Sequence, residues 1–110
     1  MDTMLLEPEL VERAFHALAP EDRAAIFSVG AAFHRLNLAK KTERAESKVR
    51  DLEARYHTTL TQLEAEGIPE DADYRMHEDY IEWHYWSRTL EQSQKALNTL
   101  SALLPAAEPT

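Results

Sequence analysis

The chain has 110 residues, no cysteine, two glycines, five prolines and a formal net charge of −8. A chain of this length predicts a single domain, residues 1–110, and the absence of cysteine excludes disulfide and thiolate chemistry. The scarcity of turn residues favours long helices over β-sheets, so we expect an all-α protein.

No apolar run approaches the roughly 20 residues that a membrane span needs. The first ten residues, MDTMLLEPEL, carry acid where a signal peptide requires positive charge. We therefore expect a cytoplasmic protein. The Ala-, Arg- and Glu-rich, Lys-poor composition suggests a bacterial origin.

The first predicted helix covers residues 8–18. Pro8 suits a first helical turn, and the acids beside it complement the helix dipole. The apolar residues of this segment recur at three- and four-residue spacing on one face: Leu10, Val11, Ala14, Phe15 and Leu18. Pro20 ends the helix, because the residue before a proline avoids helical geometry.

The second predicted helix runs over residues 21–66, with Gly30 and Asn37 as weak points that leave its continuity open. Its first apolar stripe consists of Ile26, Val29, Phe33 and Leu36. A second stripe with a period near 3.5 follows: Leu38, Thr42, Ala45, Val49, Leu52, Tyr56, Thr59 and Leu63. If the first helix folds back, it covers residues 21–33.

Gly67 and Pro69 mark a turn, after which a third helix is predicted over residues 71–103, with Pro105 ending it and residues 105–110 as a tail. Two long helices joined by so short a turn must lie antiparallel. We therefore expect a short N-terminal helix followed by a long, coiled-coil-like antiparallel helical hairpin.

The stretch HEDYIEWHYW, residues 77–86, gives the third helix two apolar faces where a hairpin needs one. The seam against helix two is predicted to hold Met76, Tyr80, Trp83, Trp86, Leu90, Leu97 and Leu104. Nearly opposite lies a second face, with its polar neighbours: Tyr74, Ile81 and Tyr85, flanked by His77, His84 and Arg88. Helix one is too short and too far away to cover this face, so we predict that a second copy or another protein does. The alternative is that the tyrosines lie flat on the helix with their hydroxyls in water.

The charge distribution suggests a homodimer. Residues 35–55 hold seven basic and four acidic side chains, a net +3, so the rest of the chain carries −11. A second hairpin laid antiparallel brings the acidic segment 70–82 of each copy beside the basic segment of the other, in a four-helix bundle capped by helix one. Within the basic segment we predict an electrostatic surface of Lys40, Lys41, Arg44 and Lys48.

Catalytic and metal chemistry find little support. A zinc helix that begins at His77–Glu78 needs histidine at position 81, where Ile81 stands, and no phosphate-binding glycine loop occurs. We predict no metal, no cofactor and no enzymatic activity. One stretch, from Arg50 through six residues to His57, resembles the loosest form of the arginine–histidine motif of HEPN-type ribonucleases. That resemblance covers eight residues and implies that His57 acts in RNA cleavage.

We expect a small, non-enzymatic interaction or adaptor protein, such as an inhibitor or antitoxin-like partner of a larger bacterial protein. The alternatives are a nucleic-acid-associated regulator that uses the basic face of helix two, and an HEPN-like ribonuclease. Salt separates the first two, because phosphate contacts weaken with added salt and an aromatic interface does not.

Overall fold

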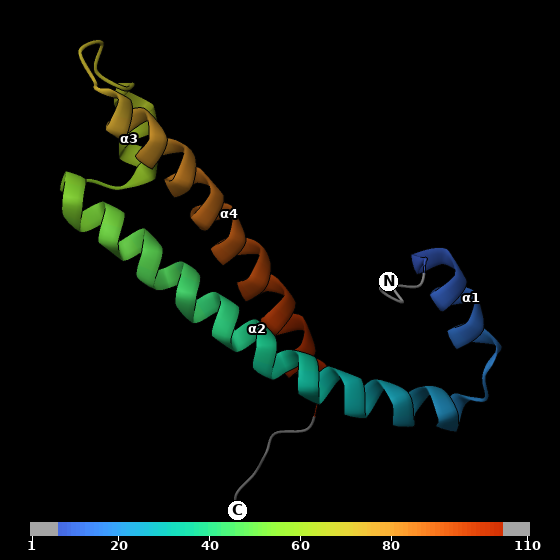
Figure 1. Cartoon of the computed structure of the whole chain (residues 1–110). Helices are drawn as coiled ribbons and strands as arrows, with labels where there is room; N and C mark the ends of the chain where they lie inside the picture. Colours follow the sequence, from blue (N-terminus) through green and yellow to red (C-terminus); the bar gives the residue numbers. More distant parts are fainter. Residues whose placement is uncertain (1–6, 105–110) are drawn as a thin grey trace, which may run out of the picture.

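A computed structural model describes residues 7–104, and the tail predicted at 105–110 lies outside this range. The four helices are α1 (Pro8–Ala17), α2 (Pro20–Tyr56), α3 (Leu60–Glu66) and α4 (Tyr74–Leu103). No strand occurs among residues 7–104, so the predicted all-α class is confirmed. Figure 1 shows α2 and α4 side by side as a long hairpin, with α3 between them in sequence at its closed end and α1 apart from it.

The hairpin is held by one narrow seam. Its α2 side buries Ala31, Leu38, Thr42, Ala45 and Leu52, and its α4 side buries Trp83, Thr89 and Ser93. Small side chains let the two backbones approach closely over much of this length. A buried hydrogen bond from the Thr42 hydroxyl to Ser93 Oγ, 2.9 Å long, sets the register between the helices.

The main apolar cluster lies at the closed end of the hairpin. It consists of Leu52, Leu63 and Trp83, with Tyr56, Leu60, Met76 and Tyr80 packed against them. α2, α3 and α4 each contribute one of the three buried residues, and burial of Leu63 holds the seven-residue α3 against the hairpin.

The predicted helix over 21–66 is wrong in one respect, because it is broken between Tyr56 and Leu60. His57 adopts a left-handed conformation (φ 55°) and ends α2, while the Thr59 side chain accepts a hydrogen bond from the Gln62 amide, 3.1 Å long. Thr59 and Gln62 have the spacing of a capping box, which starts a new helix. At the weak points proposed from the sequence, Gly30 and Asn37, the helix is continuous.

The turn that closes the hairpin begins at Gly67, as predicted, but it extends further along the chain than predicted. Gly67 has a positive φ of 85° and donates its amide to the Leu63 carbonyl, 2.7 Å away, as a glycine at a helix terminus does. The last helix begins at Tyr74 rather than near residue 71, because the Asp73 carboxylate accepts from the Met76 amide and caps it.

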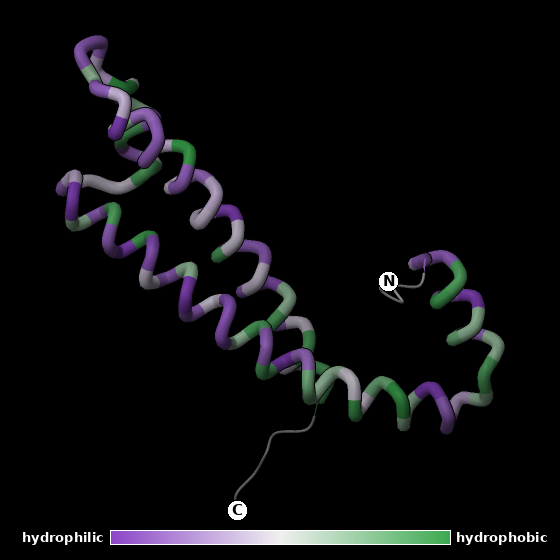
Figure 2. The backbone as a smooth tube through the Cα atoms, viewed as in Figure 1, coloured by the Kyte–Doolittle hydropathy of each residue, from purple (hydrophilic) through white to green (hydrophobic). Residues whose placement is uncertain are grey.

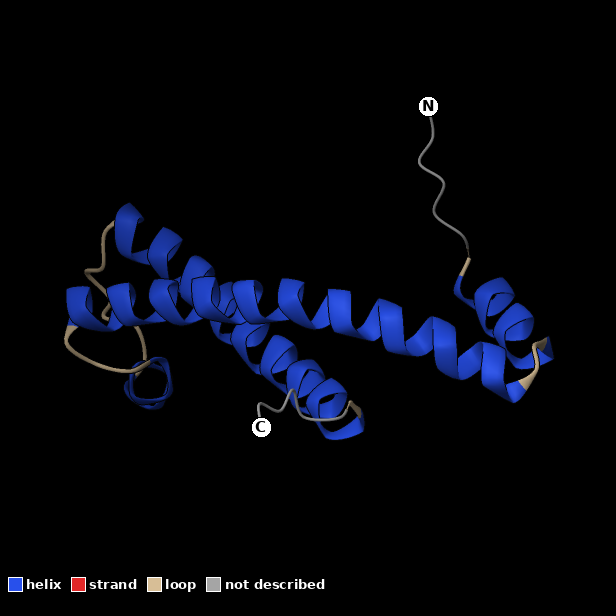
Figure 3. Cartoon of the chain, turned by 90° about the horizontal axis from the view of Figure 1, so that it is seen from below, coloured by secondary structure: helices blue, strands red, loops and turns tan. Residues whose placement is uncertain are grey.

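The N-terminal third projects from the hairpin as an arm. We call residues 8–36, which include α1 and the first part of α2, the N-terminal arm. Figures 1 and 3 show α2 continuing past the end of α4 towards α1. The Cα radius of gyration is 19.5 Å, well above the roughly 13 Å of a compact domain of this length.

The first helix does not fold back over residues 21–33, so the condition under which it was expected to cover them is not met. Val29 is 74% exposed and Phe33 67% exposed, and α1 buries none of its own residues. Only Leu18 and Ala19 separate α1 from α2, and Figure 1 shows α1 apart from the hairpin. Figure 2 shows the resulting contrast between apolar positions on the arm and hydrophilic positions at the turn between α3 and α4.

Candidate functional site

One face of α4 carries large side chains that the hairpin does not use. Tyr74, Ile81 and Tyr85 are 78%, 64% and 58% exposed, while Trp83 on the opposite side of the same helix is 1% exposed. The helix spacing of these residues places them in one line along α4. No described part of the chain covers this line, which we call the aromatic face.

On one side of the aromatic face, the polar residues already have partners within the chain. His84 Nε2 lies 3.0 Å from Glu64 of α3, and the same carboxylate oxygen accepts a 2.9 Å hydrogen bond from the Tyr80 hydroxyl. That hydrogen bond raises the pKa of Tyr80 above its ordinary value. Arg88 and His84 together line a shallow hollow beside Glu64, whereas His77 is simply exposed.

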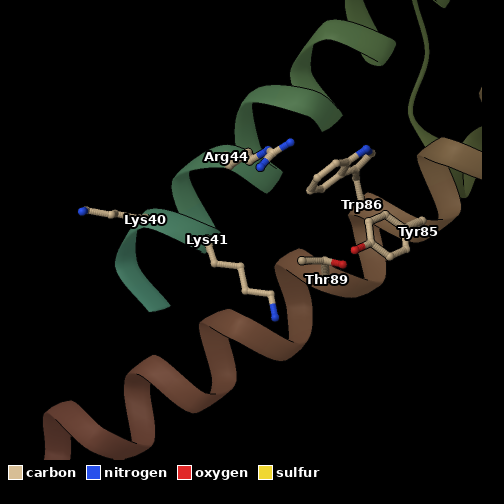
Figure 4. A pocket seen from close by; sticks show the side chains of 6 residues that line it. All are labelled: Lys40, Lys41, Arg44, Tyr85, Trp86 and Thr89. Atoms are coloured by element: carbon tan, nitrogen blue, oxygen red, sulfur yellow. The ribbon is translucent and has the colours of Figure 1, made fainter. Parts of the chain in front are cut away.

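The opposite flank of the aromatic face borders a basic groove. This groove, about 260 Å³ in volume, lies between α2 and α4 and is lined by Lys40, Lys41, Arg44, Tyr85, Trp86 and Thr89 (Figure 4). The fold thus joins three of the four predicted electrostatic residues to Tyr85 of the predicted contact set. In Figure 4 Lys41 and Arg44 extend towards α4, and Lys40 points away from it.

Trp86 organises the groove. Its ring meets that of Tyr85 edge to face, with the centroids 4.9 Å apart and the planes at 80°. The Arg44 guanidinium and the Lys48 ammonium lie 5.4 and 5.8 Å from the indole centre, which is the geometry of cation–π contacts. Two cations are therefore held against an aromatic surface. Lys48, the fourth predicted electrostatic residue, does not line the groove; it lines a second hollow towards the closed end, which also contains Arg55 and the carboxylates of Asp51, Asp79 and Glu82.

The groove keeps a net positive charge. None of Lys40, Lys41, Arg44 and Lys48 forms an ion pair with a carboxylate of residues 7–104. The ion pairs within residues 7–104 lie instead between Asp79 and the arginines Arg55 and Arg75, and between His84 and Glu64. An anionic group that enters the groove would find several cations and a polarisable ring without displacing an acid of the described chain.

The closed end is braced by Asp79. Its carboxylate accepts from the Tyr56 hydroxyl at 2.5 Å and from Arg55 Nη1 at 2.6 Å. Burial opposes ionisation of Asp79, but these hydrogen bonds and the charges of Arg55 and Arg75 outweigh it, so the Asp79 pKa is lowered. Burial and the bond to Asp79 raise the pKa of Tyr56. This network ties α2 to α4 at Asp79, two residues before Ile81 of the aromatic face.

Sequence reasoning missed two residues of the groove. It assigned Trp86 to the seam, although the ring is only half-buried, and it did not single out Thr89. The available signal was the helical position of Thr89, four residues after Tyr85 and three after Trp86.

The Arg50–His57 pattern does not lie on one helix, since α2 ends at Tyr56 and His57 is the left-handed residue after it. Within residues 7–104 no three His, Asp or Glu side chains gather in a metal-binding group. None of the helices in the described range is both long enough and apolar enough to span a membrane.

Comparisons of the chain with protein-family models, with curated proteins and with solved structures find no match.

Proposed function

We propose that this chain is a small, non-enzymatic interaction protein that binds an acidic segment of a larger protein. The observation that carries the proposal is the juxtaposition of the basic groove with the aromatic face at Tyr85. Apolar or aromatic side chains of the partner would pack on Tyr74, Ile81 and Tyr85, and its carboxylates would enter the groove.

The physical chemistry of the surface supports this proposal. Tyrosine, tryptophan and arginine supply most of the binding free energy in protein interfaces, and all three meet within this groove. Because Arg44 and Lys48 lie over the indole and form no ion pair within residues 7–104, a partner's acid gains charge complementarity and steering towards the groove. An inhibitor or antitoxin-like role is one form of this function, and a cytoplasmic location and bacterial origin remain predictions.

The experiment compares the proteins that wild-type and variant chains capture from a bacterial lysate. Lys41→Glu and Tyr85→Asp change the groove. Arg50→Glu is the matched control, because Arg50 is exposed on α2 and lines neither the groove nor the hollow that contains Lys48. We expect a captured protein that both groove variants lose and that the control retains. Equal capture by all chains would refute the proposed surface.

The second candidate is a nucleic-acid-associated regulator. The same groove favours it, because cations beside Tyr85 and Trp86 resemble the charged, aromatic surfaces on which single strands stack. The net charge of −8 works against it. Fluorescence anisotropy with a labelled single-stranded oligonucleotide at low and moderate salt separates the two, since phosphate binding falls steeply with salt. The HEPN-like alternative rests on the sequence alone and predicts that His57→Ala abolishes RNA cleavage.

A further inference from the structure

The N-terminal arm carries a second unpartnered surface, separate from the groove and the aromatic face. On α1 an apolar hollow of about 480 Å³ is lined by Leu10, Val11, Ala14, Phe15 and Leu18. On the first part of α2 the apolar residues are also exposed: Ile26, Phe27, Val29, Phe33 and Leu36. We infer that this arm docks on the arm of a second copy of the chain, forming a twofold homodimer.

The exposed area is of the size that a stable dimer needs. Apart from the half-buried Phe15, the large apolar residues of the arm are eight in number and between 37% and 74% exposed. With each such residue exposing roughly 170–240 Å² when fully accessible, they leave on the order of 800 Å² uncovered. This exposure is spread over α1 and the first part of α2, and its sum is comparable to the about 800 Å² that a standard interface buries on each partner.

The charge distribution favours the arm over the acidic segment as the place where two copies meet. Residues 8–36 contain four acidic and three basic side chains, a net −1, within a chain of −8. Residues 60–82 contain eight carboxylates and one arginine, a net −7, so two copies that met there would repel each other. The arm is thus the apolar part of the chain on which an identical, strongly acidic molecule can approach without a large electrostatic cost.

Side-chain hydrogen bonds within one copy hold the junction between α1 and α2. Arg23 Nη1 donates to the Leu18 carbonyl at 2.6 Å and to the His16 carbonyl at 3.2 Å, which binds the end of α1 to the start of α2. This fixes the angle between the two helices and reduces the ordering cost of docking. In a twofold arrangement α1 of each copy lies along the α2 stripe of the other, so both apolar surfaces are covered at once.

The test measures mass in solution by sedimentation at about 100 μM. We expect wild type near twice 12.6 kDa, and the double variant Val29→Glu/Phe33→Glu near 12.6 kDa with unchanged helical circular dichroism. Both positions are exposed and glutamate is a good helix former, so the variant keeps the hairpin. The matched control Ile81→Glu, on the aromatic face, remains a dimer.

Three outcomes would overturn the inference. A monomeric wild type would mean that the chain's own termini or another protein covers the arm. A dimeric Val29→Glu/Phe33→Glu variant would place self-association elsewhere, and dissociation by Ile81→Glu alone would place it on the aromatic face, as in the four-helix bundle predicted from the sequence. The proposed partner binding is judged separately, because its variants lie outside the arm.

Discussion

Replacement of Trp83 tests whether the hairpin depends on the apolar cluster at its closed end. Trp83 is 1% exposed, stacks on Tyr56 with the ring centroids 5.8 Å apart, and contacts Leu52 and Leu63. Trp83→Ala removes roughly 150 Å² of buried apolar surface, which at about 25 cal/mol per Å² corresponds to about 4 kcal/mol. Measured tryptophan-to-alanine losses of about 3–5 kcal/mol agree with this magnitude.

Trp83→Phe separates packing from polarity. The indole Nε1–H is buried and has no acceptor among residues 7–104, and an unsatisfied buried donor costs about 1–3 kcal/mol. Phenylalanine keeps most of the ring area and removes this donor. The two effects oppose each other, so we expect Trp83→Phe to change the free energy of unfolding by about 1 kcal/mol or less.

The assay is urea unfolding followed by far-ultraviolet circular dichroism, with all chains at one concentration because association would add to the apparent stability. A small domain has only about 5–15 kcal/mol of stability, so Trp83→Ala should unfold at a much lower urea concentration than wild type. A loss below about 1 kcal/mol, or equal losses in the two variants, would refute the assigned role of the cluster.

Two further predictions concern polar contacts between α2 and α4. The lowered pKa of Asp79 means that its carboxylate stabilises the fold above the unfolded pKa near 3.8 and that this contribution disappears as the pH falls through the lower folded value. Asp79→Asn should therefore be less stable than wild type at pH 7, with the difference shrinking below about pH 4 in urea unfolding at several pH values; a constant difference would contradict the assignment. At the seam, Thr42→Val alone should cost about 1 kcal/mol, because Ser93 Oγ loses its donor, and adding Ser93→Ala should recover part of that loss. Strictly additive losses in this double-mutant cycle would show that the two hydroxyls do not interact.

The helical hairpin was predictable because its signals are local. Leu38, Thr42, Ala45 and Leu52 recur at helical spacing, and Gly67 marks the turn. The break after Tyr56 was missed because the apolar stripe continues through Leu63, although the spacing of Thr59 and Gln62 was visible. The period of the apolar stripe indicated a continuous helix, whereas the spacing of Thr59 and Gln62 indicated a new helix start. The structure follows the capping residues.

The basic groove was predictable only in part. The sequence identifies Lys40, Lys41, Arg44 and the exposed Tyr85 as separate sets, since each lies on its own helix. Their meeting depends on how α2 and α4 are rotated against each other, which follows from the close packing of the small seam residues and not from either helix alone. The exposure of the arm likewise depends on the length of the link after Ala17.

The uneven distribution of bulk along the seam has a dynamic consequence. The large aromatic rings are at the end where α3 joins, whereas further along the pair the buried residues are Leu38 and smaller alanine, threonine and serine side chains. Such a hairpin should open first at the end near Ala31 and last near Trp83, because local unfolding begins where few apolar contacts must be broken.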